Sequence, residues 1–187
     1  MGVALLVQRK SDMLSCMTIV HRLVLIRHAQ AQQTDDGNDH ERTLTDRGRA
    51  DAESLGHWLR EKGVSPQETW CSTSARTRET WAAIVDASGM GGMVDHEKRI
   101  YNADPDELLR VVNELDPTVE TVALVGHAPG IPILASELAG GKGDADALAQ
   151  LELSYPTCTV AVLDVDGEWA DAGPGGARLV AMHTARA

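Results

Sequence analysis

The sequence predicts an α/β fold, a three-layer α/β/α sandwich built around a mostly parallel central sheet. Short aliphatic runs at 23–26 and 122–125 show no polar alternation, which is typical of strands buried on both faces of a parallel sheet. Apolar residues at helical spacing follow these runs, and strands that alternate with helices favour an open sheet covered on both faces. The chain shows no internal repeat, so we expect a single domain.

The chain has 187 residues, which is enough for one hydrophobic core. We expect residues 19–187 to form the domain and residues 1–18 to be a poorly ordered N-terminal extension. The apolar run at 3–7 is far too short to cross a membrane or to act as a signal peptide, and Met17 offers a later start. An extra strand or helix docked on the domain is the alternative.

The first strand is followed by a long polar loop at 30–43. Loops of this length are usually functional or mobile, so this one is either a flap that faces the substrate or a solvated linker. A helix capped by Thr43 or Thr45 should follow and end near Gly63. A short strand at 70–72 and a helix capped by Ser74 come next. The buried stripe of the first helix comprises Gly48, Ala52, Leu55 and Leu59.

The second half of the chain begins with the run Asp104-Pro105-Asp106-Glu107. This is a strong helix start, because Asp is a favoured cap, Pro suits the first position and Glu suits the third. A strand at 120–126 and a helix that stops at Gly140 follow, and 142–150 is a loop or a frayed helix. The β-branched run at 157–165, a turn and the run at 178–184 indicate a final hairpin.

Charge and cysteine content restrict the partners. A net charge of −11 argues against a general nucleic-acid or anionic-membrane binder. It does not exclude an anionic substrate, because the Debye length is about 8 Å at physiological salt and a local basic pocket escapes distant carboxylates. The three cysteines show no motif spacing, which suggests reduced thiols in the cytoplasm.

Two predicted strands end in side chains that suit phosphate chemistry. The first runs into Arg27 and His28, and the strand at 120–126 runs into His127. Arginine presents a forked donor array to phosphate, and histidine can be a neutral nucleophile near pH 7. Ligands collect beyond the carboxyl ends of parallel strands, so both histidines can face one pocket. Arg76 lies in the first turn of a helix, where an anion would be attracted.

Other chemistries lack their sequence signals. No two histidines are three or four residues apart, and there is no C-x-x-C pair, so we expect no dedicated metal site. There is no Walker A loop, dinucleotide fingerprint or nucleophile elbow, and we expect no cofactor. Ordinary structural roles are expected for the other histidines and for Cys71, a small buried residue.

Four motifs together resemble the short histidine phosphatase superfamily, which has the phosphoglycerate mutase-like fold. The resemblance covers roughly 21–165 and is greatest to the compact phosphohistidine phosphatase, SixA-type branch. Asp39-x-x-Arg42, ahead of Leu44, is a further shared feature. The motifs are Arg27-His28-Ala29, Leu44-Thr45-x-x-Gly48, Ser72-x-x-x-Arg76-x-x-x-Thr80 and Val125-Gly126-His127-Ala128-Pro129-Gly130.

The resemblance implies a metal-independent phosphatase that forms a covalent phosphohistidine on His28. Arg27, Arg76 and His127 would surround the phosphoryl oxygens and stabilise their charge. We expect the other ring nitrogen of His28 to bond a backbone carbonyl. Arg42 and Ala128 are the predicted substrate-binding residues, and the substrate is a phosphorylated small molecule or a phosphohistidine protein.

The chain departs from the family pattern at three places. Ala29 replaces a glycine, Thr73 stands where proline is common, and no glutamate matches the general acid of the larger relatives. Asp104 is the nearest candidate acid, although a helix cap explains it fully. The alternatives are a phosphoglycerate mutase-type phosphotransferase, against which the missing acid and the short chain argue, and a non-catalytic phosphate-binding module. The physiological substrate and the oligomeric state stay open.

Overall fold

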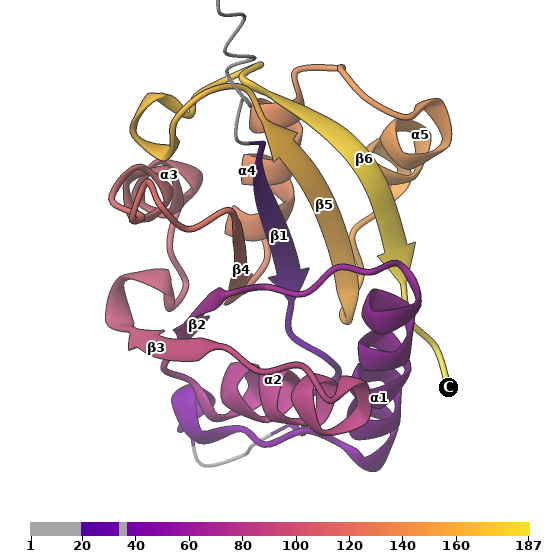
Figure 1. The fold of residues 1–187 in the computed structure, drawn as a ribbon. Coiled ribbons are helices and arrows are strands. Elements are labelled where there is room, and N and C mark those ends of the chain that lie inside the picture. The colour runs from indigo at the N-terminus through magenta and orange to yellow at the C-terminus, as the bar shows by residue number, and fades with distance from the viewer. Residues whose placement is uncertain (1–19, 34–36) are drawn as a thin grey trace, which may run out of the picture.

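The computed structural model describes residues 20–33 and 37–187, and the extension expected at 1–18 lies outside them. The described strands form one six-stranded sheet in the order β3-β2-β4-β1-β5-β6 (Figure 1). The strands are β1 (His21–Arg27), β2 (Glu68–Ser72), β3 (Met93–Glu97), β4 (Thr121–Gly126), β5 (Thr159–Val165) and β6 (Ala177–Thr184). The α-helices are α1 (Asp46–Glu61), α2 (Ala75–Ser88), α3 (Pro105–Asn113), α4 (Gly130–Ala139) and α5 (Ala145–Leu153).

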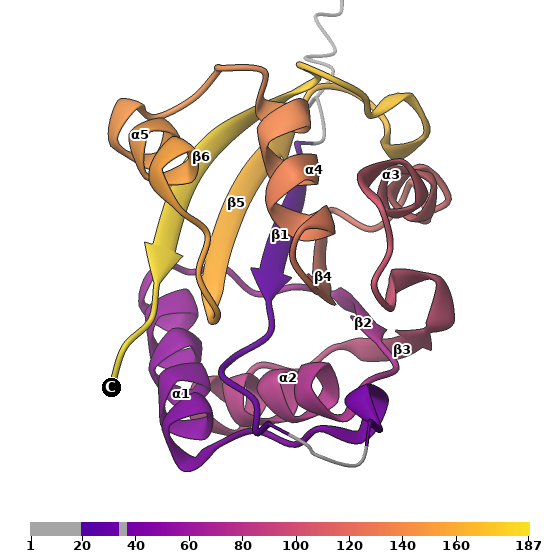
Figure 2. The same ribbon diagram turned by 180° about the vertical axis from the view of Figure 1, so that it is seen from behind.

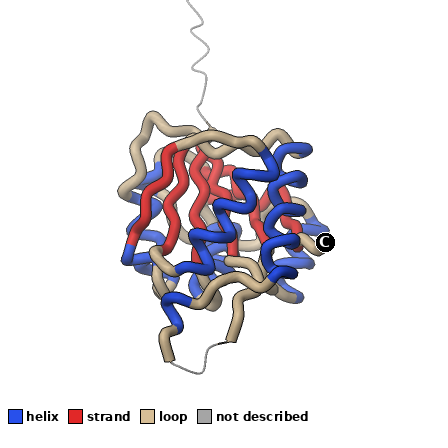
Figure 3. Tube along the Cα trace, turned by 90° about the horizontal axis from the view of Figure 1, so that it is seen from below, coloured by secondary structure: helices blue, strands red, loops and turns tan. Residues whose placement is uncertain are grey.

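The sheet is mostly parallel. β1, β4, β2 and β3 run in one direction, and β5 and β6 add an antiparallel hairpin beside β1. Helices α1 and α2 cover one face, whereas α3, α4 and α5 pack on the other (Figures 1 and 2). Seen from below, the strands lie between these helices (Figure 3). The predicted three-layer α/β/α sandwich is therefore confirmed.

The aliphatic run of β1 explains how both layers attach to the sheet. Alternate side chains of a strand point to opposite faces. Leu23 and Leu25 accordingly belong to the core under α3 and α4, while Val24 and Ile26 belong to the core under α1 and α2. All four side chains are fully buried, so the strand has no face for water.

The start of α1 shows why the chain carries Thr45 and Gly48. Thr45 is the helix cap, and its hydroxyl accepts from the Gly48 amide at 2.9 Å. A Cβ on Gly48 would lie 2.1 Å from the carbonyl oxygen of Gln30, so only glycine lets the helix approach the segment that follows β1. The cap choice left open between Thr43 and Thr45 is thereby settled, and the predicted buried stripe of α1 is confirmed.

Two segments were incompletely predicted. β3 was not expected at all, because this edge strand is mostly exposed and has no buried alternate positions. The segment at 142–150 contributes to helix α5, which begins with the Asp144 carboxylate accepting from the Ala147 amide at 3.0 Å. Among the described helices, none is long and apolar enough to cross a membrane.

Candidate active site

The register of two neighbouring strands brings the two predicted histidines together. Arg27 of β1 pairs with Gly126 of β4 in the parallel ladder, and each strand is followed by a histidine. The His28 amide donates to the Gly126 carbonyl at 3.0 Å. As a result, the rings of His28 and His127 lie side by side at a tilt of 58°, with centroids 5.2 Å apart.

The backbone around His28 fixes both its position and its tautomer. Nδ1 of His28 lies 2.7 Å from the Ala29 carbonyl oxygen, a contact that requires a proton on Nδ1 and leaves Nε2 with a free lone pair. The Ala29 amide donates in turn to the Thr80 hydroxyl of α2 at 3.0 Å, and the Cys158 amide donates to the His28 carbonyl at 3.0 Å. The predicted bond to a backbone carbonyl is therefore present.

Electrostatics keep the His28 ring neutral. Burial lowers the pKa of His28 to about 4, and the nearby Arg76, Arg27 and Arg42 guanidinium groups act in the same direction. Each of these influences disfavours the protonated ring. Near pH 7 the imidazole is therefore unprotonated and available as a nucleophile.

His127 is held between a hydroxyl and a cation. Its Nε2 lies 2.8 Å from the Ser72 hydroxyl at the end of β2, and its Nδ1 lies 3.2 Å from Arg76 Nη2. The side chain is buried, and this burial lowers the pKa of His127 to about 3, with further lowering from His28, once that ring is protonated, and from the Arg76 guanidinium. His127 is thus a second neutral ring beside the first.

Two arginines contribute permanent positive charge. Arg27 Nη1 donates to the Tyr155 carbonyl at 2.8 Å. Arg76 is 3% exposed and lies in the first turn of α2. Within the described part of the chain, the Nε atoms of both arginines are buried and lack a hydrogen-bond partner. Buried donors are normally satisfied, so these guanidinium groups are suited to a ligand that brings its own acceptors.

Asp39 and Tyr101 were not predicted as site residues. Asp39 lies in the 3-10 helix Asp39–Glu41, and its carboxylate accepts from Arg76 and from the Tyr101 hydroxyl at 3.0 and 2.7 Å. The Arg76 guanidinium also lies over the Tyr101 ring, 5.7 Å from its centroid. The available signal for Asp39 was its place in the Asp39-x-x-Arg42 motif. Tyr101 had no comparable signal.

The three remaining predicted residues occupy different places. Arg42 donates to the Gln32 carbonyl at 2.6 Å and to Asp39 Oδ1 at 2.8 Å. Ala128 is partly buried in the turn that leads from His127 into α4. Asp104 is exposed, and its carboxylate caps α3 by accepting from the Glu107 amide at 2.8 Å. Arg42 therefore lies near the strand-end residues through its contact with Asp39, whereas Asp104 acts as a helix cap.

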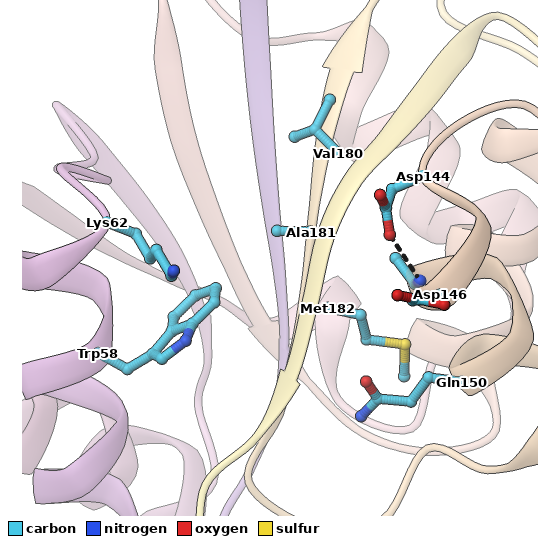
Figure 4. Close-up of a pocket in the computed structure, with 9 residues that line it drawn as sticks. Trp58, Lys62, Asp144, Asp146, Gln150, Val180, Ala181 and Met182 are labelled. Carbon is cyan, nitrogen blue, oxygen red and sulfur yellow. Dashed lines mark hydrogen bonds between the residues drawn. The ribbon is translucent and has the colours of Figure 1, made fainter.

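A separate hollow at the edge of β6 has a different character (Figure 4). It is lined by residues of α1, α5 and β6, including Trp58, Lys62 and Asp146. The Trp58 ring stacks on His183 with a centroid separation of 4.8 Å, and Asp144 is engaged as a helix cap. This hollow has no buried cation, so it does not share the chemistry of the strand-end site.

The strand-end site can bind an oxyanion next to a nucleophilic nitrogen. The guanidinium groups of Arg27, Arg76 and Arg42 supply donors and positive charge, as a transferring phosphoryl group requires, and neutral His28 supplies the nucleophilic nitrogen. The described residues include no group of three or more His, Cys, Asp or Glu side chains placed to hold a metal ion.

Comparison with known proteins gives consistent matches. The model of the histidine phosphatase superfamily (branch 1) matches residues 23–107. An uncharacterised protein of Mycobacterium tuberculosis is 36% identical over 162 residues, which cover 86% of this chain and 100% of that protein.

Two solved structures extend the likeness to most of the fold. A candidate phosphohistidine phosphatase SixA from Nakamurella multipartitia is 35% identical, with a TM-score of 0.78 over 90% of this chain and 98% of that one. A second candidate SixA, from Agrobacterium tumefaciens, is 29% identical, with a TM-score of 0.73 over 87% and 97% of the two chains.

Proposed function

This chain belongs to the histidine phosphatase superfamily, as a SixA-like phosphatase, and we propose that it removes phosphoryl groups from phosphohistidine by way of a covalent intermediate on His28. The observation that carries the proposal is the meeting of His28 and His127 at the ends of neighbouring parallel strands, beside the partly buried Arg27 and the buried Arg76. The relatives named as SixA support phosphohistidine as the substrate.

The first chemical step is an in-line attack on phosphorus. His28 Nε2 supplies the electron pair, because its Nδ1 proton is committed to the Ala29 carbonyl at 2.7 Å. A bond forms between Nε2 and phosphorus while the bond to the leaving group breaks. Arg27, Arg76 and His127 stabilise the charge on the three equatorial oxygens during transfer.

The second step returns the enzyme to its starting state. Water attacks the phosphohistidine, the new P–O bond forms and the P–N bond breaks, so inorganic phosphate leaves and His28 becomes neutral again. The low pKa of His28, about 4, makes this imidazole a good leaving group in hydrolysis. Because the arginines supply the positive charge, we expect chelators to leave turnover unchanged.

The carboxylates near the site limit which leaving groups the enzyme can expel. An alkoxide needs a general acid, which typically contributes about 10² to 10⁴ in rate. The Arg42 and Tyr101 hydrogen bonds hold the pKa of Asp39 well below its usual range, so Asp39 cannot donate a proton near pH 7. Imidazole leaves more readily, since its ring is protonated by solvent with a pKa of about 6.5. A mutase, which expels a sugar or glycerate alkoxide, is the less suitable reaction for this site.

The experiment is a rapid quench during turnover of an aryl phosphate, followed by peptide mass spectrometry. We expect an acid-labile, alkali-stable phosphoryl group on His28. A series of aryl and alkyl phosphates should then show kcat/KM falling steeply as the leaving-group pKa rises, with a phosphohistidine peptide turned over fastest. A phosphoryl group on another residue, or a flat leaving-group dependence, would contradict the mechanism.

The compartment is a finer part of the same proposal. Cys71 and Cys158 are buried, unpaired thiols, and burial raises the pKa of each to about 12. Unreactive free thiols are common in reducing compartments. We therefore place the phosphatase in the cytoplasm.

A further inference from the structure

Asp39 lies among the cations to which we assign the phosphoryl group. Its carboxylate accepts from Arg42 Nη1 at 2.8 Å and from Arg76 Nη2 at 3.0 Å. Its main-chain oxygen accepts from Arg76 Nη1 at 2.6 Å. A single acidic residue therefore holds both outer nitrogens of Arg76.

The simplest interpretation is charge balance, because a buried guanidinium needs a counter-ion. Two features go beyond that role. The Asp39 side chain is 46% exposed, against 4% for Arg76, so the carboxylate lies where solvent and ligands can reach it. Arg76 Nη2 is also 3.2 Å from His127 Nδ1. A phosphoryl group that contacts Arg76 and His127 must then come close to this carboxylate.

This proximity is unfavourable for the binding of a phosphate ester. A phosphate dianion and the Asp39 carboxylate would compete for the same Arg76 donors and would repel each other. Like charges about 5 Å apart in a partly buried site change an affinity by about 10- to 100-fold. Asp39 should therefore weaken the binding of dianionic esters and of inorganic phosphate.

Phosphohistidine adds an attraction that a phosphate ester lacks. Its ring can carry a proton, and the resulting imidazolium places a positive charge beside the phosphoryl group. In this form the P–N bond breaks with its electron pair passing to the ring nitrogen, while phosphorus bonds to His28 Nε2. The leaving group departs as neutral imidazole and keeps the proton that it already carried. A nearby carboxylate attracts the imidazolium ring, and this attraction offsets the repulsion between the carboxylate and the phosphoryl oxygens.

We propose that Asp39 is a specificity-determining residue, which favours phosphoryl groups on a protonated imidazole over dianionic phosphate esters. The inference rests on the proposed function and adds a basis for substrate choice. Arg42 and the Tyr101 hydroxyl, which both donate to the carboxylate, hold Asp39 ionised in this place.

The test compares two substrates whose leaving groups are matched. One is a phosphohistidine peptide, and the other is an aryl phosphate whose phenol has a pKa close to that of the imidazolium. The wild-type enzyme should favour the peptide in kcat/KM by about tenfold or more. Asp39→Asn should reduce this ratio by about 10- to 100-fold and should make inorganic phosphate a tighter inhibitor. Asp39→Glu, which keeps the charge, should retain most of the preference.

Glu41→Gln is the matched control. Glu41 lies two residues away on the same 3-10 helix, and its carboxylate contacts His40 and Arg78 instead of Arg76. Its substrate ratio should stay within about twofold of wild type, as for other exposed ion pairs.

Each outcome decides between the two proposals. An equal loss of both activities in Asp39→Asn would make Asp39 a mere counter-ion and overturn the inference. If that variant does not fold, equal kcat/KM values for the matched substrates in the wild-type enzyme would overturn it instead. A wild-type enzyme that turns over neither substrate would refute the proposed function itself.

Discussion

Two helices near the site begin in opposite ways. Helix α3 starts at Asp104, which caps it with a bond of 2.8 Å to the Glu107 amide, and its first turn carries proline and two acids. Helix α2 starts at Ser74, whose hydroxyl makes no cap bond and lies 2.8 Å from the Thr77 hydroxyl. The first turn of α2 contains no acid and contains Arg76 instead.

The contrast distinguishes residues that stabilise the fold, at the start of α3, from residues that take part in catalysis, at the start of α2. Acids at a helix N-terminus are stabilising and cations there are disfavoured, so α3 follows the local rules and α2 breaks them. Violations of local rules concentrate at functional sites. The buried Arg76 is such a violation, and it faces His127 and Asp39. A change at the start of α2 should therefore alter activity, whereas a change at the start of α3 should alter stability.

The largest effect is expected at His28, whose neighbour Ala29 is held by Thr80 of α2. His28→Ala removes the nucleophile and should lower kcat/KM by about 10⁴-fold or more. Circular dichroism and phosphate affinity should change little, because the ring is only partly buried and the arginines remain in place. His57→Ala, on the exposed side of α1, is the control and should behave as wild type. More than a few per cent of wild-type turnover in a clean His28→Ala preparation would rule the nucleophile out.

The next largest effect is expected at Arg76, the cation in the first turn of α2, and at Arg27. Arg76→Ala and Arg27→Ala should each lower kcat/KM for an aryl phosphate by about 10²- to 10³-fold, as for a lost oxyanion donor. Two other arginine variants serve as controls. Arg78→Ala changes an exposed side chain of the same helix, and Arg22→Ala changes a residue at the opposite end of β1. These two controls should stay within a few-fold of wild type. Equal losses in tests and controls would mean that only general positive charge matters.

Much of this site could be predicted because its signals are local. Aliphatic runs that end in Arg27-His28 and His127 fix two strand ends, and parallel pairing then brings those ends to one edge. Arg76 was identifiable as a cation in the wrong turn of a helix. The same reasoning located the buried stripe of α1, since amphipathic spacing reports burial directly.

Other features could not be predicted because they depend on long-range contacts. Asp39 meets Arg76 across 37 positions and Tyr101 across 62 positions of the chain, and no spacing rule announces such contacts. Edge strand β3 is largely exposed, so it lacks the hydrophobic pattern that marks a buried strand. Ser74 occupies the predicted cap position of α2, but its hydroxyl bonds the Thr77 hydroxyl in place of a backbone amide.

A smaller effect concerns the free energy of unfolding at acidic pH, which the active-site histidines should lower. The pKa of His28 is lowered to about 4, against about 6.5 in an unfolded chain. Between these values the unfolded chain binds a proton that the folded ring does not. The free energy of unfolding should therefore fall as the pH drops from about 6.5 towards 4, by up to about 1.4 kcal/mol per pH unit for one such group.

Denaturant titrations of wild type and His28→Ala at several pH values measure this slope. The variant should lose less stability on acidification, because it lacks one of the three described histidines whose pKa is lowered in the folded protein. His127, with its pKa lowered to about 3, should account for part of the remaining slope. Parallel curves for the two proteins would show that the folded His28 titrates normally.

The smallest effect is expected at Asp104, where the stability side of the comparison can be tested against a catalytic role. Asp104→Asn keeps a good helix cap, so it should change the free energy of unfolding by only a few tenths of a kcal/mol, whereas Asp104→Ala should cost about 1 kcal/mol. Neither variant should change kcat/KM or its dependence on leaving-group pKa, because the carboxylate is exposed and committed to the Glu107 amide. Urea unfolding and the ester series measure the two properties separately. If Asp104→Asn retained its stability but lost activity, most severely for substrates with poor leaving groups, Asp104 would be the general acid. The first residues of α3 would then take part in catalysis, as those of α2 do. A favourable helix-capping sequence would no longer mark a residue as purely structural.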